Sequence, residues 1–370
     1  MRQLAFIRKG RLRWQEVPEP QLQDPGDALV RPFAVARCDA DASLIFGNAS
    51  RLALGIAVHA VDPAVVSVFG TAPYRQPVAL GHECVAEIVA TGEHVGRFRA
   101  GQAVIVPFQI SCGRCPRCRR GLTGYCEAVP PFSAYGFGAA GGDWGGMLSD
   151  MVRVPYADEM LVAVPDGMDP VALASLSDNL PDAWRAVGPP LRQHPGSPVL
   201  VVGGGAKAIG LYAAGIAVAL GAARVDYVDT DADRLTTAAT MGVTPIEGSI
   251  PPAGRAYPVT VDASGRIPGL AAAVRAVEPG GVCTSVTPYF KQGAQLPLFD
   301  MYAKGSAFRT GFSNARADIP EVLALVEDGR FRPELVTTRL APWEDATEAL
   351  YDRSAKVVIV RDRITAATPG

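Results

Sequence analysis

The sequence has little net charge, no long apolar run and few cysteines, and each shortage narrows the functions that it can serve. Its 35 basic and 37 acidic side chains leave a net charge of -2, so no excess favours a nucleic-acid or anionic-membrane partner. The longest apolar run, IGLYAAGIAVALGAA, is shorter than the roughly 20 residues that cross a bilayer. Charges also interrupt the N-terminus, where a signal peptide needs an apolar stretch, so a cytoplasmic location is expected.

Cysteine is scarce, yet four of the seven cysteines fall within residues 111–126, with the spacing C-x2-C-x2-C-x7-C. In a reducing compartment such a cluster favours a metal over disulfides. Four thiolates close a tetrahedral shell around Zn²⁺ with no open position, so the spacing predicts a structural zinc in a lobe over residues 109–128. A disulfide pair or an iron–sulfur cluster is the alternative. The predicted ligands are Cys112, Cys115, Cys118 and Cys126. The arginines expected to offset the charge and donate to sulfur are Arg114, Arg117, Arg119 and Arg120.

Two hydrophobic patterns divide the chain and indicate an α/β protein. Up to about residue 165, short apolar runs alternate with Gly, Pro and charged turns, which predicts a β-rich domain. Apolar strands then alternate with helical segments up to residue 310, which is typical of a doubly wound parallel sheet. The tail predicts a helix over 319–328 and a strand over 356–362. Segment 46–76 has no clear period and is expected to form a loop with a short helix.

The stretch VVGGGAKAIG follows an apolar strand and opens a helix. Gly203, Gly205 and Ala208 fit G-x-G-x-x-G/A, whose glycines let the backbone approach a pyrophosphate at a helix N-terminus. Asp229 closes the second strand, where a carboxylate binds the ribose hydroxyls of NAD and repels the 2′-phosphate of NADP. Arg234, a turn into the next helix, is near the ribose but is a poor ligand for that phosphate. The pattern predicts dinucleotide binding with NAD favoured over NADP; the alternative is a glycine turn in an ordinary α/β domain.

The order of these parts resembles the zinc-containing medium-chain alcohol dehydrogenase family over nearly the whole chain. The resemblance rests on LGHECVAEIVATGEHVGRFRAGQAVIVPF, on VEPGGVCTSV and on DATEAL. It implies a GroES-like catalytic domain over residues 1–165, to which residues 311–370 return, and a Rossmann NAD-binding domain over 166–310. It also implies a catalytic zinc and a homodimer or homotetramer.

The resemblance places the catalytic zinc residue by residue. Cys38, in CDAD, stands at the first ligand and His82, in GHE, at the second. The region of the third ligand resembles that of the glutathione-independent formaldehyde dehydrogenases, which use an aspartate, here Asp178; alternatively Asp178 caps the following helix. These three leave an open position for water or a substrate oxygen. Glu83 is expected behind the metal, and Asp41 is expected to accept a hydrogen bond from the other nitrogen of His82.

The sequence departs from the family at three places. Ala40 replaces a hydroxyl residue that relays protons. The glycine loop is longer than usual, so that the family's last glycine corresponds to Gly210, after Ile209. Segment 46–76 exceeds ordinary loop lengths and is expected to reshape or cover the substrate pocket.

Together these features predict a zinc- and NAD(H)-dependent oxidoreductase that interconverts a small alcohol and an aldehyde or ketone. A specialised reductase, a dismutase or a lyase-like enzyme are alternatives on the same fold, and a non-catalytic dinucleotide-binding protein is another. Neither nucleic acid nor a membrane is an expected partner. Candidates for the wall of the substrate pocket are Tyr74, Phe108, Trp144 and Trp184.

Overall fold

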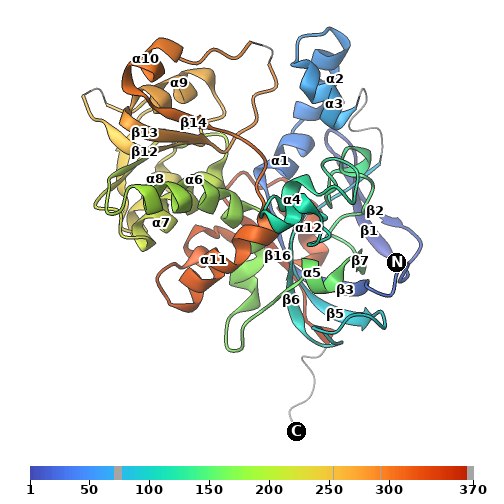
Figure 1. Cartoon of the computed structure of the whole chain (residues 1–370). Helices are drawn as coiled ribbons and strands as arrows, with labels where there is room; N and C mark the ends of the chain where they lie inside the picture. The colour runs from blue at the N-terminus through green and yellow to red at the C-terminus, as the bar shows by residue number, and fades with distance from the viewer. Residues whose placement is uncertain (71–76, 253, 292, 365–370) are drawn as a thin grey trace. The chain divides into compact units, whose positions relative to one another are not determined.

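The computed structural model of the chain describes residues 1–70, 77–252, 254–291 and 293–364 (Figure 1). These residues form two compact units. The first comprises Met1–Asp178, Asn314–Pro320 and the chain from Thr337 onward, and the second comprises Asn179–Ser313 and Glu321–Val336. The bounds differ from those of the predicted domains, because residues 166–178 belong to the first unit and residues 311–313 and 321–336 to the second.

The first unit is rich in strands. Its strands are β1 (Arg2–Arg8), β2 (Arg11–Glu16), β3 (Ala28–Arg37), β4 (Val78–Ala79), β5 (Glu83–Thr91), β6 (Ala103–Val106), β7 (Val152–Val154), β8 (Val162–Ala163), β15 (Arg339–Pro342) and β16 (Val357–Val360). Its α-helices are α1 (Asp39–Ile45), α2 (Asn48–Ala57), α3 (Pro63–Phe69), α4 (Pro116–Arg119), α5 (Ala157–Met160) and α12 (Ala346–Ala349). Its 3-10 helices are η1 (Thr123–Tyr125), η2 (Gly138–Gly141), η3 (Pro170–Ser177) and η5 (Trp343–Asp345).

Strand β3 lies at the centre of the larger sheet of this unit. The strand order is β15-β16-β3-β5-β6-β8, with β7 also paired to β3, and a smaller sheet has the order β2-β1-β4. Strand β3 pairs antiparallel with β5 on one side and with β16 on the other. Apolar side chains of these strands, such as Val35, Ile88 and Ile359, are almost completely buried in one core. The residues that flank β3 and β5 therefore have a firmly packed support.

The second unit is a doubly wound parallel sheet, as the alternation of strands and helices predicts. Its strands are β9 (Val199–Val202), β10 (Val225–Asp229), β11 (Thr244–Glu247), β12 (Tyr257–Asp262), β13 (Val277–Ser285) and β14 (Ala307–Arg309). Its helices are α6 (Asn179–Gln193), α7 (Lys207–Ala219), α8 (Ala232–Thr240), α9 (Ile267–Arg275), α10 (Leu298–Lys304) and η4 (Pro333–Val336). All neighbouring strands are parallel, in the order β11-β10-β9-β12-β13-β14. Numbered along the unit this is 3-2-1-4-5-6, the Rossmann order.

Two expectations for local structure need correction. Segment 46–76 contains two helices, α2 and α3, where a loop with one short helix is expected; residues 71–76, with the candidate Tyr74, lie outside the described residues. The helix expected over 319–328 is α11 (Ala315–Glu327), which starts earlier because the carbonyl of Asn314 accepts hydrogen bonds from Ala317 and Asp318.

Within the described parts of the chain, no helix is both long enough and apolar enough to cross a bilayer.

Candidate functional site

The four clustered cysteines converge on one point in the first unit. The sulfur atoms of Cys112, Cys115, Cys118 and Cys126 all lie within 4.8 Å of one another. Short helix α4 begins directly after Cys115, whose sulfur accepts a hydrogen bond from the N–H of Cys118. Gly113 permits the tight turn before it, with φ of +69°. Four thiols at this mutual distance fit a tetrahedral zinc ion.

Backbone N–H groups supply the described hydrogen bonds to these sulfurs. Cys112 donates to the sulfur of Cys126 and Cys115 to that of Cys112, each at 3.4 Å. Hydrogen bonds from the N–H groups of Glu127 and Cys118 lower the pKa of the Cys115 thiol to about 6, whereas burial raises the pKa of Cys118 and Cys126, so these two become thiolates only beside a cation. The expectation that arginines donate to sulfur is not met by Arg117, which pairs with Glu127 at 3.0 Å. Arg114 lies instead over the ring of Tyr156.

A second cluster brings together the residues expected to hold the catalytic zinc. Ligand atoms of Cys38, His82, Glu83 and Asp178 all lie within 4.8 Å of one another, and all four residues are buried. The Cys38 sulfur is 3.5 Å from Oδ2 of Asp178, and the same oxygen is 3.3 Å from Nε2 of His82. One thiol, one imidazole and one carboxylate thus face a common centre, with Nε2 as the ligating nitrogen.

Three short structural motifs hold these groups in place. Cys38 directly follows β3 and caps α1, and its N–H donates to Asp41 at 3.0 Å in a capping box. His82 immediately precedes β5. Asp178 ends η3, which Ser177 fastens to β5: its hydroxyl accepts from the N–H of Cys84 at 2.8 Å and donates to the Cys84 carbonyl at 2.9 Å. The prediction from sequence missed this role of Ser177, which no motif signals.

The environment of these groups fits a bound cation. Neither ring nitrogen of the buried His82 makes a well-aligned hydrogen bond, although Nδ1 lies 3.2 Å from Oδ1 of Asp41. Burial alone would lower the pKa of His82, but the neighbouring carboxylates of Asp41 and Asp178 raise it well above its ordinary value. Burial and then the charge of Asp178 raise the pKa of the Cys38 thiol to about 12, so a thiolate forms here only beside a cation. The donor set suits zinc.

Glu83, the fourth member of this cluster, is paired with a lysine from the tail of the chain. Both side chains have no exposed surface, and Nζ of Lys356 lies 3.0 Å from each carboxylate oxygen of Glu83. Nζ also donates to the carbonyl of Arg37 at 3.2 Å. Burial raises the pKa of Glu83 to about 7, against the opposing effect of Lys356. The prediction missed Lys356; its only sequence signal is a lysine at the start of the apolar run KVVIV.

Three aromatic candidates for the pocket wall lie in different parts of the structure. Phe108 is 5% exposed and its ring centroid lies 5.7 Å from that of His82. Trp144 packs against the core of the first unit, with Arg153 over its ring. Trp184 belongs to the second unit, where it is 3% exposed beneath Arg192. Only Phe108 among them lies beside the candidate metal centre.

The longer glycine loop of the second unit packs against the segment that follows β12. The N–H groups of Gly205 and Ala206 donate to the carbonyls of Ser264 and Ala263, each at 2.9 Å. Helix α7 begins at Lys207, and its first intrahelical bond runs from Gly210 to the carbonyl of Ala206 at 3.0 Å. The donors offered to a pyrophosphate are therefore in the first turn of α7, which contains Ala208 and Ile209, rather than in the glycines themselves.

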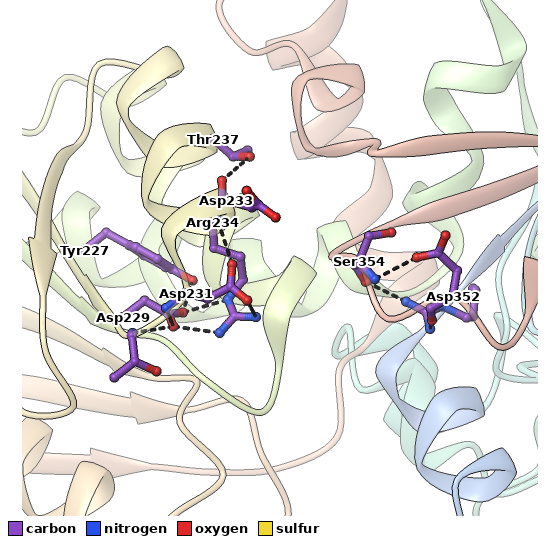
Figure 2. Close-up of polar contacts among 10 residues, drawn as sticks. Tyr227, Asp229, Asp231, Asp233, Arg234, Thr237, Asp352 and Ser354 are labelled. Carbon is purple, nitrogen blue, oxygen red and sulfur yellow. Dashed lines mark hydrogen bonds and ion pairs between the residues drawn. The ribbon is translucent and has the colours of Figure 1, made fainter.

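Asp229 occupies the end of β10, as predicted, and is held by several donors (Figure 2). Nε and Nη2 of Arg234 donate to its two carboxylate oxygens at 2.8 and 2.6 Å. The buried hydroxyl of Tyr227 donates to Oδ2 at 2.8 Å. A Cβ at Gly203 would lie 2.5 Å from the same oxygen, so this glycine is needed for the close approach of Asp229. Although burial raises the pKa of Asp229, Arg234 lowers it below its ordinary value, so Asp229 is an anion.

Comparison with known proteins points to one family. The alcohol dehydrogenase GroES-like domain matches residues 24–166. A protein of Mycobacterium tuberculosis, described as a probable zinc-binding alcohol dehydrogenase, is 30% identical over 362 residues, which cover 96% of this chain and 86% of that protein. The glutathione-independent formaldehyde dehydrogenase of Pseudomonas aeruginosa is 32% identical over 254 residues, or 65% of this chain and 57% of that enzyme.

Solved structures agree with this result. The alcohol dehydrogenase of Thermus sp. ATN1 is 30% identical, with a TM-score of 0.81 over 97% of this chain and 99% of that one. A zinc-binding dehydrogenase of Sinorhizobium meliloti bound to NADP shares the fold at 22% identity. Its TM-score is 0.73 over 97% of this chain and 99% of that one. An alcohol dehydrogenase of Escherichia coli complexed with NADH also shares the fold, at 20% identity. Its TM-score is 0.76 over 98% of this chain and 99% of that one.

Proposed function

The chain belongs to the zinc-containing medium-chain alcohol dehydrogenase family, and on that basis we propose how its residues divide the work of this chemistry. It is a zinc-dependent oxidoreductase that interconverts alcohols and aldehydes or ketones with a nicotinamide dinucleotide. Cys38, His82 and Asp178 would hold the catalytic zinc, and the four-cysteine loop would hold the structural zinc. The observation that carries this assignment is the convergence of the three buried groups on one centre.

The residues of the first unit prepare the metal site for substrate. Zinc, when bound, acts as a Lewis acid on an alcohol or carbonyl oxygen, and the nicotinamide carries the hydride. Asp41 faces Nδ1 of His82 at 3.2 Å, where its carboxylate can accept the Nδ1 proton once Nε2 binds the metal. Lys356 lies 3.0 Å from the Glu83 carboxylate and offsets its negative charge beside the proposed ligands.

The test of this function is turnover combined with metal analysis. We expect two zinc ions per chain by plasma mass spectrometry, and oxidation of alcohols or reduction of aldehydes and ketones with NAD(H) across a panel of substrates. A single zinc ion per chain in freshly purified protein contradicts the two-site assignment. Absence of turnover with every alcohol, aldehyde and ketone contradicts the function.

NAD(H) is the proposed cofactor rather than NADP(H). The Asp229 carboxylate is negative and can accept hydrogen bonds from ribose hydroxyls, whereas it repels a 2′-phosphate. Arg234 has few donors left for a 2′-phosphate, because Asp229 occupies two of its nitrogens and Asp231 the third, at 3.1 Å. Its engagement in these pairs, more than its place in the helix, makes it a poor ligand for the phosphate.

Asp229→Asn is expected to narrow the preference for NADH over NADPH by about tenfold. The change weakens a charge-assisted hydrogen bond to the ribose and removes the repulsion of the 2′-phosphate, and each ~1.4 kcal/mol is a factor of ten in affinity. Dissociation constants from quenching of tryptophan fluorescence measure it. The matched control is Asp231→Asn, which touches the same arginine but leaves Asp229 in place, and it should change the ratio much less. Wild-type protein that prefers NADPH overturns the assignment.

A homodimer or homotetramer is the proposed assembly, in the cytoplasm, where the cysteine cluster suits metal binding. Strand β14 is the outermost strand of its sheet. The adjoining helix α10 exposes Leu298, Phe299 and Tyr302 by 68%, 82% and 84%. A second copy paired at this edge would cover both the open strand and the apolar side chains. Light scattering measures the assembly directly.

A further inference from the structure

The helices of segment 46–70 have a defined geometry but no role in the function described so far. Helix α3 starts at Pro63 after Asp62, whose carboxylate accepts from the N–H of Ala64 at 2.9 Å. It ends at Phe69, because Gly70 has φ of +74°. Val65 is 8% exposed and packs the helix against the protein. The chain therefore positions Phe69 at a fixed helix end.

A continuous line of rings joins Phe69 to the candidate metal centre. The ring of Phe69 lies edge-to-face on Phe132, with centroids 5.1 Å apart at 70°. Phe132 meets Phe137 in the same way, at 5.2 Å and 73°. Phe137 lies 5.0 Å from the ring of His82. Phe108, at 6.3 Å from Phe137 and 5.7 Å from His82, closes the inner end of the line. All of these residues belong to the first unit.

The burial of these rings changes along the line. His82 and Phe108 are 1% and 5% exposed, whereas Phe137, Phe132 and Phe69 are all half-buried. Phe132 also adopts a left-handed backbone, with φ of +61°, which is unfavourable for a residue with a large side chain. A row of half-buried aromatic rings that begins at a proposed metal ligand offers apolar surface of the kind that lines small-molecule sites.

We propose that Phe69 is a specificity-determining residue, and that the site takes alcohols or aldehydes that carry an aromatic ring some carbons away from the reacting group. The reacting oxygen lies toward Cys38, His82 and Asp178, and the substrate ring packs along Phe137 and Phe132 to Phe69. Aromatic rings prefer such offset or edge-to-face partners. The inference rests on the proposed function, because it assumes that the reacting oxygen approaches this metal centre.

The test compares three alcohols of increasing reach: ethanol, benzyl alcohol and 3-phenylpropan-1-ol. For Phe69→Ala we expect KM for 3-phenylpropan-1-ol to rise up to about tenfold, which corresponds to the loss of one aromatic pair. The change for benzyl alcohol should be smaller and that for ethanol near zero. Ligand-observed NMR titration of the same alcohols gives dissociation constants without turnover, and these should follow the same order.

Two control variants separate the ring of Phe69 from the helix that carries it. Leu54→Ala removes a 64% exposed side chain of α2 and should leave all three alcohols unaffected. Val65→Ala loosens α3 but keeps the ring, so its effect on 3-phenylpropan-1-ol should be smaller than that of Phe69→Ala; an equal or larger effect would mean that the packing of the helix and not the ring sets the selectivity, and the inference would be wrong. If Phe69→Ala changes KM equally for all three alcohols, or changes it for none of them, the inference is also wrong, while the proposed function stands. If no alcohol is turned over, the proposed function fails and the NMR constants still decide the role of Phe69.

Discussion

The Asp178→Asn variant is expected to fold normally, to retain one zinc ion per chain and to lose on the order of 1,000-fold in kcat/KM. A metal Lewis acid supplies several kcal/mol of transition-state stabilisation, and each ~1.4 kcal/mol is a factor of ten in rate. Asparagine has nearly the same shape as aspartate but offers zinc no negative oxygen. Because Asp178 lies 3.5 Å from the Cys38 sulfur and 3.3 Å from Nε2 of His82, its charge is central to this donor set. Steady-state kinetics and zinc analysis of the same preparation measure both effects.

Asp169→Asn is the matched control for this variant. Asp169 begins the 3-10 helix that Asp178 ends, is exposed, and accepts from the N–H of Val171 at 3.0 Å. Asparagine caps a helix as well as aspartate does, so this variant should keep both zinc ions and full activity. Two zinc ions and wild-type rates in Asp178→Asn would remove Asp178 from the ligand set and leave Glu83 as the remaining acid of the cluster.

Lys356→Met is expected to reduce the free energy of unfolding by about 3–5 kcal/mol, because it leaves the carboxylate of Glu83 buried without a partner. Glu83 and Lys356 are both fully buried, so water cannot replace the lost ammonium group. A loss of this size should lower the melting temperature by about 10 °C, as measured by calorimetry of the zinc-loaded protein.

The double variant Glu83→Gln with Lys356→Met tests the cause of that loss. Replacing both charges removes the unpaired carboxylate, so much of the stability should return. If the double variant is as unstable as Lys356→Met alone, the lysine stabilises the protein through its packing or its bond to the carbonyl of Arg37, and not through Glu83.

The features that could be predicted from the sequence are those encoded by nearby residues. The alternation of strands and helices predicts the doubly wound sheet, and the cysteine spacing predicts a cluster that the structure brings within 4.8 Å. Asp229 could be located because the end of the second strand is readable from hydrophobicity. The resemblance to a known family led to Cys38, His82 and Asp178, which are far apart in the sequence and could not be joined by spacing alone.

The features that were missed depend on contacts between distant segments. Lys356 meets Glu83 only because β16 pairs with β3, which itself pairs with β5. Tyr227 looks like an ordinary strand residue, and its bond to Asp229 depends on the space left by Gly203. The helices of segment 46–76 were not predicted because its apolar residues do not follow a clear helical period. In α2, for example, the apolar side chain of Leu54 is 64% exposed instead of facing the core.

The pairing of β3 with β16 also sets the order in which the catalytic centre can mature on the ribosome. Cys38, His82 and Asp178 emerge early, but the strand that covers the free edge of β3 and the lysine that neutralises Glu83 follow only after the whole second unit has been synthesised. Until then residues 34–37 of β3, which β16 covers in the folded protein and β7 does not, have an open edge that can pair with other chains. The sheet that supports the candidate metal centre is therefore completed only after residues 357–360 have been synthesised, whereas the four-cysteine loop is contained in residues 112–126 and can bind a metal while the chain is still growing.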